Sequence, residues 1–95
     1  MIVRISGTGQ FELDDAAVRR LDELDTELTQ ALRGRERERF HQVLHDTIEF
    51  VQSSGSVVPA DRVVPSQVII PPEDISLEDA ERFFSDEGLM EPLPA

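Results

Sequence analysis

The sequence predicts an α+β fold: an N-terminal β-hairpin, an antiparallel helical hairpin, a short third strand and a C-terminal helix. Two observations carry this prediction. Apolar residues alternate near the N-terminus, whereas they are spaced three and four apart through residues 14–52. Residues 57–72 are strongly apolar but contain four prolines, so this stretch is expected to be extended rather than helical.

The hairpin is predicted from two short strands at residues 2–5 and 10–13. Val3 and Ile5 share one face of the first strand, and the intervening glycines supply the turn. The Gly-Thr-Gly triplet at 7–9 matches neither phosphate-binding glycine pattern, and no helix opens directly after it. A turn is therefore favoured over a phosphate site.

Two amphipathic helices are predicted next. Asp14 or Asp15 can cap the first, which runs to about Arg33, and Gly34 is expected to form the turn to a second helix at 36–52. The expected buried stripes are Ala17, Val18, Leu21, Leu24, Leu28, Ala31 and Leu32 in the first helix, and Phe40, Val43, Leu44, Thr47, Ile48 and Val51 in the second.

The aliphatic side chains of 57–72 are expected to be covered, because each gains roughly 1.5 kcal/mol or more on leaving water. The stretch therefore has to lie extended against either the protein's own body or a partner. Residues 68–70 can add a third strand to the hairpin, since two strands alone are marginally stable.

A capping box at residues 76–79 is expected to start a short helix through about Phe84. Gly88 would close this helix, and residues 91–95 would form a frayed tail.

Composition indicates one domain, residues 1–95, with no cysteine and a formal net charge of −11. Such a charge repels nucleic acid and anionic lipid, so direct binding to either is not expected. No secretory signal and no transmembrane-length apolar run is present, which favours a cytoplasmic protein. We find no catalytic arrangement above background, and therefore expect a non-enzyme without a cofactor.

His41 and His45 form the one tempting metal motif, because histidines four apart lie on one helix face. However, Gln42 stands where the H-E-x-x-H motif has its glutamate base. Glu38 and Glu49 lie one turn to either side, and no third ligand is evident. Two histidines at the core boundary are favoured over a metal site, which leaves a metal-dependent hydrolase as the least favoured alternative.

The run 33–39 is the only cationic region, and Arg33, Arg35 and Arg37 could bind an acidic partner. Glutamates alternate with these arginines, a pattern more typical of a solvated, salt-bridged start of a helix. No aromatic residues interleave with them, which argues against nucleic acid.

An aromatic–methionine cluster lies near the C-terminus, where the residues 85–88 (Ser-Asp-Glu-Gly) separate Phe83 and Phe84 from Leu89 and Met90. Adjacent residues on a helix diverge by about 100°, so one phenylalanine can face the core while the other faces outward. The cluster either completes the core, which we favour, or docks into a groove on a partner.

The chain resembles the PspA-associated protein (PspAA) family, whose members open with a similar MIVRI segment and carry a VPSDLVLPP-like stretch before a short acidic helix. The matching residues are Met1, Ile2, Val3, Arg4, Ile5, Gly7, Gly9, Gln10, Val64, Pro65, Ser66, Val68, Ile70, Pro71, Pro72, Leu77, Glu78, Gly88 and Leu89. The most specific part is the P-S-x-V-x-x-P-P segment.

This resemblance implies a non-enzymatic adaptor or regulator of PspA, the coiled-coil, membrane-remodelling protein of the envelope stress response. It also implies that contact with the inner face of the cell membrane is indirect, through PspA. The alternative is a homodimeric structural module in which residues 2–5 or 68–70 pair across a two-fold axis.

Overall fold

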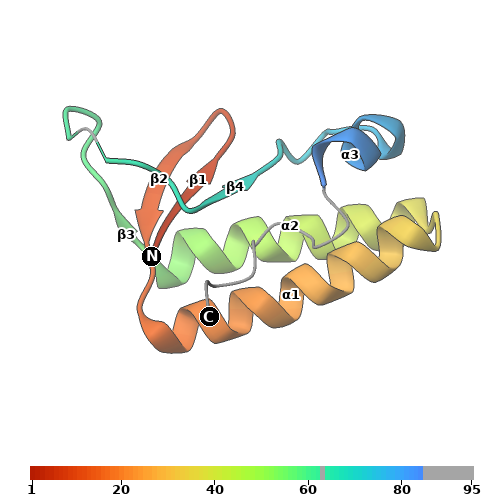
Figure 1. The fold of residues 1–95 in the computed structure, drawn as a ribbon, viewed down its shortest axis with the longest axis horizontal. Helices are drawn as coiled ribbons and strands as arrows, with labels where there is room; N and C mark the ends of the chain where they lie inside the picture. Colours follow the sequence, from red (N-terminus) through yellow and green to blue (C-terminus); the bar gives the residue numbers. More distant parts are fainter. Residues whose placement is uncertain (63, 85–95) are drawn as a thin grey trace.

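The computed structural model describes residues 1–62 and 64–84. Its elements are β1 (Ile2–Ile5), β2 (Gly9–Glu12), α1 (Asp15–Arg33), α2 (Arg37–Ser54), β3 (Ser56–Val57), β4 (Val68–Ile70) and α3 (Leu77–Phe83). The sheet and α3 form one layer, which lies over the pair of long helices (Figure 1). The predicted α+β class is confirmed.

The sheet has four strands in the order β3-β2-β1-β4. β1 is antiparallel to β2 and parallel to β4, so Val3 lies opposite both Phe11 and Val68. The hairpin and the third strand at Val68–Ile70 were predicted correctly, whereas β3, which pairs with β2, was not predicted. The buried side chains of the sheet are Val3, Ile5, Phe11, Val68 and Ile70.

The proline-rich stretch carries the chain from β3 at one edge of the sheet to β4 at the other. Polar contacts tie it to the hairpin: Nε2 of Gln10 donates to the carbonyl oxygen of Val64 at 2.9 Å and to Oγ of Ser66 at 2.7 Å. The backbone N–H of Ile2 donates to Oε1 of Gln67 at 2.7 Å. The side chain of Gln10 thus fastens the connection between β3 and β4 to the strand β2.

Only part of the stretch 57–72 is covered by the protein's own body. Val58, Val68 and Ile70 are buried, but Val57 and Ile69 are 72% and 47% exposed. Because side chains alternate along a strand, burying Val68 and Ile70 turns Ile69 to the other face of β4. Cover of Val57 and Ile69 by a partner stays a prediction, and Val63 lies outside the described residues.

The helix α1 begins where the sequence indicates, because the Asp14 side chain accepts a hydrogen bond from the Ala17 backbone N–H at 2.8 Å. Its apolar stripe is buried, with Val18 only partly buried and the polar Asp25 buried beside it. In α2 the stripe is buried from Phe40 to Val51, except that Val43 is half-buried. The antiparallel helical hairpin is thus confirmed.

The turn between α1 and α2 is a Schellman motif. The backbone N–H of Glu36 donates to the Ala31 carbonyl at 2.9 Å, and that of Arg35 donates to the Leu32 carbonyl at 3.0 Å. Gly34 has a helical φ of −79°, whereas Arg35 has a φ of +52°. The left-handed position usually taken by glycine therefore belongs to Arg35, which the sequence did not indicate.

Gly55 ends α2 at a place with no room for a side chain. A Cβ there would lie 2.7 Å from the Val51 carbonyl oxygen and 3.0 Å from side-chain atoms of both Leu13 and Phe11. Its φ is −87°, which any residue can adopt. Glycine is needed here because α2 and the end of β2 approach each other closely.

The short helix α3 forms through the predicted cap, with Oγ of Ser76 accepting from the Asp79 backbone N–H at 3.1 Å. Leu77, Ala80 and Phe84 are buried against the body of the protein. The expected end of this helix at Gly88 and the expected tail at 91–95 lie outside the described residues.

Replacing Gly55 with alanine should lower the free energy of unfolding by about 1–3 kcal/mol, because the added methyl group overpacks the contact with β2. Urea denaturation measures this change. Ser54→Ala, at the exposed neighbouring position, is the matched control and should change stability by less than about 0.5 kcal/mol. Equal stability of the two variants would contradict the close approach.

Replacing Arg35 with glycine should leave the protein about 1 kcal/mol more stable than replacing it with alanine. Both variants lose the Arg35 side chain, but only glycine adopts a positive φ without steric cost. The difference between the two thermal melting curves measures the cost of holding alanine, instead of glycine, at a positive φ. An Arg35→Ala variant as stable as Arg35→Gly would show that the turn does not hold this residue in the left-handed region.

Candidate functional site

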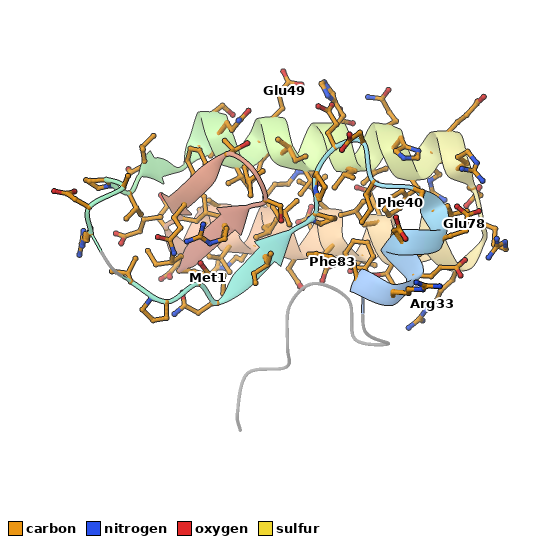
Figure 2. All side chains as sticks on the ribbon, turned by 90° about the horizontal axis from the view of Figure 1, so that it is seen from above. Met1, Arg33, Phe40, Glu49, Glu78 and Phe83 are labelled. Atoms are coloured by element: carbon orange, nitrogen blue, oxygen red, sulfur yellow. The ribbon has the colours of Figure 1, made fainter. Side chains whose placement is uncertain are left out.

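Among the described residues that the sequence singled out, the arginines and phenylalanines lie near the turn between α1 and α2, whereas His45 lies midway along α2. Figure 2 shows Arg33, Phe40, Glu78 and Phe83 at the end of the molecule near this turn. Residues 73–84 lead from β4 into α3 and lie along the N-terminal half of α2 (Figure 1). We call residues 73–84 the strap.

A line of polar contacts fastens the strap to α2. Arg37, His41 and His45 are four residues apart and therefore lie on one face of the helix. As the strap runs forward, its partners run backward toward the start of α2. The contacts are His45 with Glu73, His41 with the Ile75 carbonyl, Arg37 with Glu78 at 3.3 Å and, from the preceding turn, Arg35 with Glu81. We call these four contacts the polar seam.

His41 is half-buried and has an oxygen atom against each ring nitrogen. Its Nδ1 lies 2.9 Å from the Arg37 carbonyl oxygen, and its Nε2 lies 2.7 Å from that of Ile75. The ring also packs edge-on to Phe40, with centroids 5.5 Å apart. His41 thus acts as a link between the helix and the strap.

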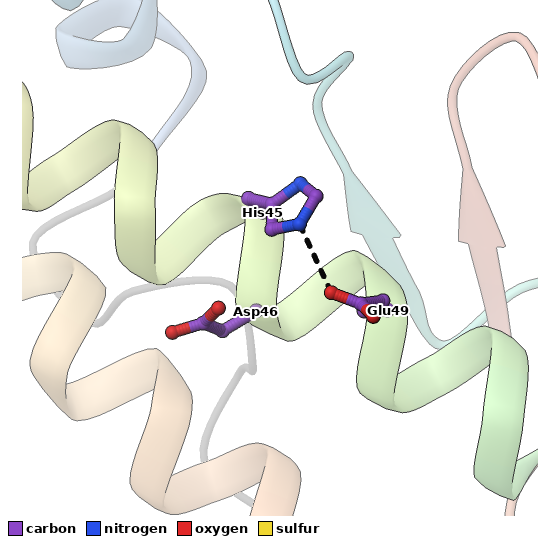
Figure 3. A group of neighbouring side chains, drawn as sticks. All are labelled: His45, Asp46 and Glu49. Atoms are coloured by element: carbon purple, nitrogen blue, oxygen red, sulfur yellow. Dashed lines mark ion pairs between the residues drawn. The ribbon is translucent and has the colours of Figure 1, made fainter.

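His45 is about half exposed and lies among carboxylates. Its Nε2 is 2.9 Å from Glu49 on the same helix, and its Nδ1 contacts Glu73 of the strap. Figure 3 shows the pair with Glu49 and the neighbouring Asp46, whose carboxylate accepts a hydrogen bond from Gln42 at 3.0 Å. One ligand atom each of the exposed His45, Asp46 and Glu49 lies within 4.8 Å of the others, and these side chains take part in the ion pairs and the hydrogen bond just described.

Two groups of the seam have a shifted pKa, through hydrogen bonds first and neighbouring charges second. The hydrogen bond from His45 to Glu73 and the charge of Glu73, supported by Glu49 and Asp46, raise the pKa of His45 above its ordinary value of 6.5. The backbone N–H of Glu78 itself, and then the charge of Arg37, lower the pKa of the Glu78 carboxyl. Each shift favours the charged form of the group, and so the ionised seam.

The arginines of the run 33–39, which we call the arginine cluster, form ion pairs within the fold as well as lying on the surface. Arg35 and Arg37 pair with carboxylates of α3, and Arg39 pairs with Glu36 at 3.1 Å. The expectation of a salt-bridged start to the second helix is confirmed. Binding of a partner by Arg33, Arg35 and Arg37 stays a prediction.

The two adjacent phenylalanines at the end of α3, Phe83 and the C-cap residue Phe84, face different ways, as expected. Phe84 is buried and packs edge-on against Phe40, with ring centroids 5.9 Å apart, whereas Phe83 is 41% exposed. Phe83 is the exposed aromatic side chain within the described part of the chain. Leu89 and Met90, the other members of the predicted cluster, lie outside the described residues.

Reasoning from the sequence did not find the residues of the strap that contact α2 and the turn before it. Glu73, Glu78 and Glu81 are spaced so that they can follow Arg35, Arg37 and His45 in reverse order, and this charge complementarity is the signal that could have revealed them. The Ile75 carbonyl carries no such signal, because a backbone atom leaves no trace in composition.

Comparison with known proteins gives one match. The family model for PspAA, the PspA-associated protein, matches residues 1–92. Searches of the curated proteins and of the solved structures gave no match. Within the described residues, no helix is long and apolar enough to cross a membrane. Because the matching family model spans nearly the whole chain, the protein belongs to the PspA-associated protein family.

Proposed function

We propose that this protein is a non-enzymatic adaptor or regulator that associates with a PspA-like coiled-coil protein in the envelope stress response. The observation that carries the proposal is the family match over residues 1–92, since the family is described by its association with PspA. The net charge of −11 favours encounter with a partner that presents basic residues. It also favours indirect contact with the membrane, through that partner, at the cytoplasmic face.

We propose the outer face of α3 as the surface that meets the partner. Phe83 offers a large apolar side chain at 41% exposure, and the charged Asp79 and Arg82 are exposed on the same short helix. An aromatic anchor within a charged rim is the usual arrangement of an interface hot spot. Arg35 and Arg37 flank this surface through their pairs with Glu81 and Glu78.

In the homodimeric alternative, the strand order of the sheet limits which strand could pair with a second copy. β1 lies between β2 and β4, so it cannot pair across a two-fold axis without losing a neighbour. β4 is at the edge, and its exposed Ile69 leaves Val68–Ile70 as the strand through which a second copy would pair. Pro71 directly follows β4 and limits such a ladder, because proline has no backbone donor.

A hydrolase built on His41 and His45 is not what we propose. The two rings face different groups, backbone carbonyls in one case and carboxylates in the other, and both histidines fasten the strap. Their spacing is explained by the seam, which needs one contact per turn of α2.

Mixing the protein with the PspA homologue of the same genome should give a complex, and Phe83→Ala should weaken it about tenfold, because the variant removes the aromatic anchor. Calorimetry at two salt concentrations measures the affinity and its electrostatic part. Val57→Ala is the matched control, since Val57 is an exposed apolar side chain outside α3 and should leave the affinity unchanged.

Absence of any complex for the unmodified protein would refute the association itself. A complex that Phe83→Ala and Val57→Ala weaken equally would leave the association standing but place the interface elsewhere.

A further inference from the structure

We propose that the strap is a proton-controlled clasp: protonated His45 holds residues 73–84 on α2, and loss of that proton loosens them. This inference rests on the contacts within the chain and does not depend on association with PspA. It concerns the exposed end of the polar seam, where the strap first meets the helix.

The described charged groups around His45 are all negative. Glu73 faces it from the strap, and Glu49 and Asp46 face it from α2 itself. The described residues that act electrostatically on this ring are therefore all carboxylates. With the imidazole protonated, Glu73 pairs with a cation. With the imidazole neutral, the ring can donate from only one nitrogen, so it cannot hydrogen-bond both Glu73 at Nδ1 and Glu49 at Nε2.

The direction of the effect follows from linkage. Because the pKa of His45 is raised in the folded state, its contribution is fully present below pH 6.5, the ordinary value. The contribution is lost as pH rises through the folded-state value. The clasp is therefore closed at mildly acidic pH and weakened at alkaline pH.

The contacts that hold the strap are few enough for the change of one to be measured. α3 has seven residues, fewer than an isolated helix needs to be stable in water. The pairs of Arg35 and Arg37 with α3 are solvent-exposed, as is that of His45 with Glu73, and each such pair contributes little alone. The other contacts are that of His41 with the Ile75 carbonyl and the apolar contact of Leu77, Ala80 and Phe84 with the body of the protein.

Loosening the strap would uncover an apolar surface. Phe40 is fully buried, and the ring of Phe84 packs against it. Leu77 and Ala80 are likewise buried in the closed arrangement. The clasp thus couples the charge of one exposed imidazole to the exposure of an apolar surface near the turn between α1 and α2.

Hydrogen exchange of the full chain between about pH 5.5 and 8.5 tests the clasp, since glutamates stay ionised over that range. The reporters are the backbone amides of Ala80 and Phe84, which donate to the carbonyls of Ser76 and Ala80 at 2.9 and 3.0 Å. After correction for intrinsic rates, their protection should fall by about two- to fivefold as pH rises. Amides in the middle of α1 should not follow this change.

Variants identify the group responsible. His45→Gln and Glu73→Gln should both abolish the pH response of the α3 amides. Glu49→Gln is the matched control, because it removes a carboxylate next to His45 but leaves the contact with the strap, and the response should persist. A wild-type response in His45→Gln, or α3 amides that track those of α1 at every pH, would overturn the clasp.

A second measurement does not depend on exchange. The titration midpoint of the His45 ring, followed by NMR, should fall in Glu73→Gln, because the main group that stabilises the imidazolium is gone. An unchanged midpoint would show that Glu73 and His45 do not interact in solution, and the proposal would fail.

Discussion

The burial of one face of α2 is the interaction on which the rest of this structure depends. Phe40, Leu44, Ile48 and Val51 form a stripe that shares one hydrophobic core with the sheet and α1. The sheet has only four short strands, and its outer face leaves side chains such as Ile69 exposed. It is stable because its inner face is covered by the helical pair, as a small domain with a single core requires.

The same helix uses a second, polar face to place the strap. Its buried stripe orients α2, and that orientation turns Arg37, His41 and His45 toward residues 73–84. The seam then positions α3 with Phe84 inward and Phe83 outward. A single helix thereby connects the core, the arginines of the run 33–39 and, through the seam, the helix α3 that carries the surface proposed for the partner.

The sequence predicted helices and strands correctly where a capping residue or a regular spacing of apolar residues marks them. Asp14 and Ser76 cap α1 and α3 as expected, because a capping side chain needs only its own neighbours. The strand at Val68–Ile70 was also predicted, but its pairing with β1 was not. The left-handed conformation of Arg35 was missed, because the Schellman turn accepts a residue there that local preference disfavours.

The sequence by itself determined the α+β class, the two amphipathic helices and the family, because period, caps and the proline-rich stretch are local features of the chain. Tertiary structure alone decided the strand order, the exposure of Val57 and the contact of His41 with the Ile75 carbonyl. Those features depend on which distant segments meet when the core is buried, and contacts across 34 residues of chain leave no periodic mark.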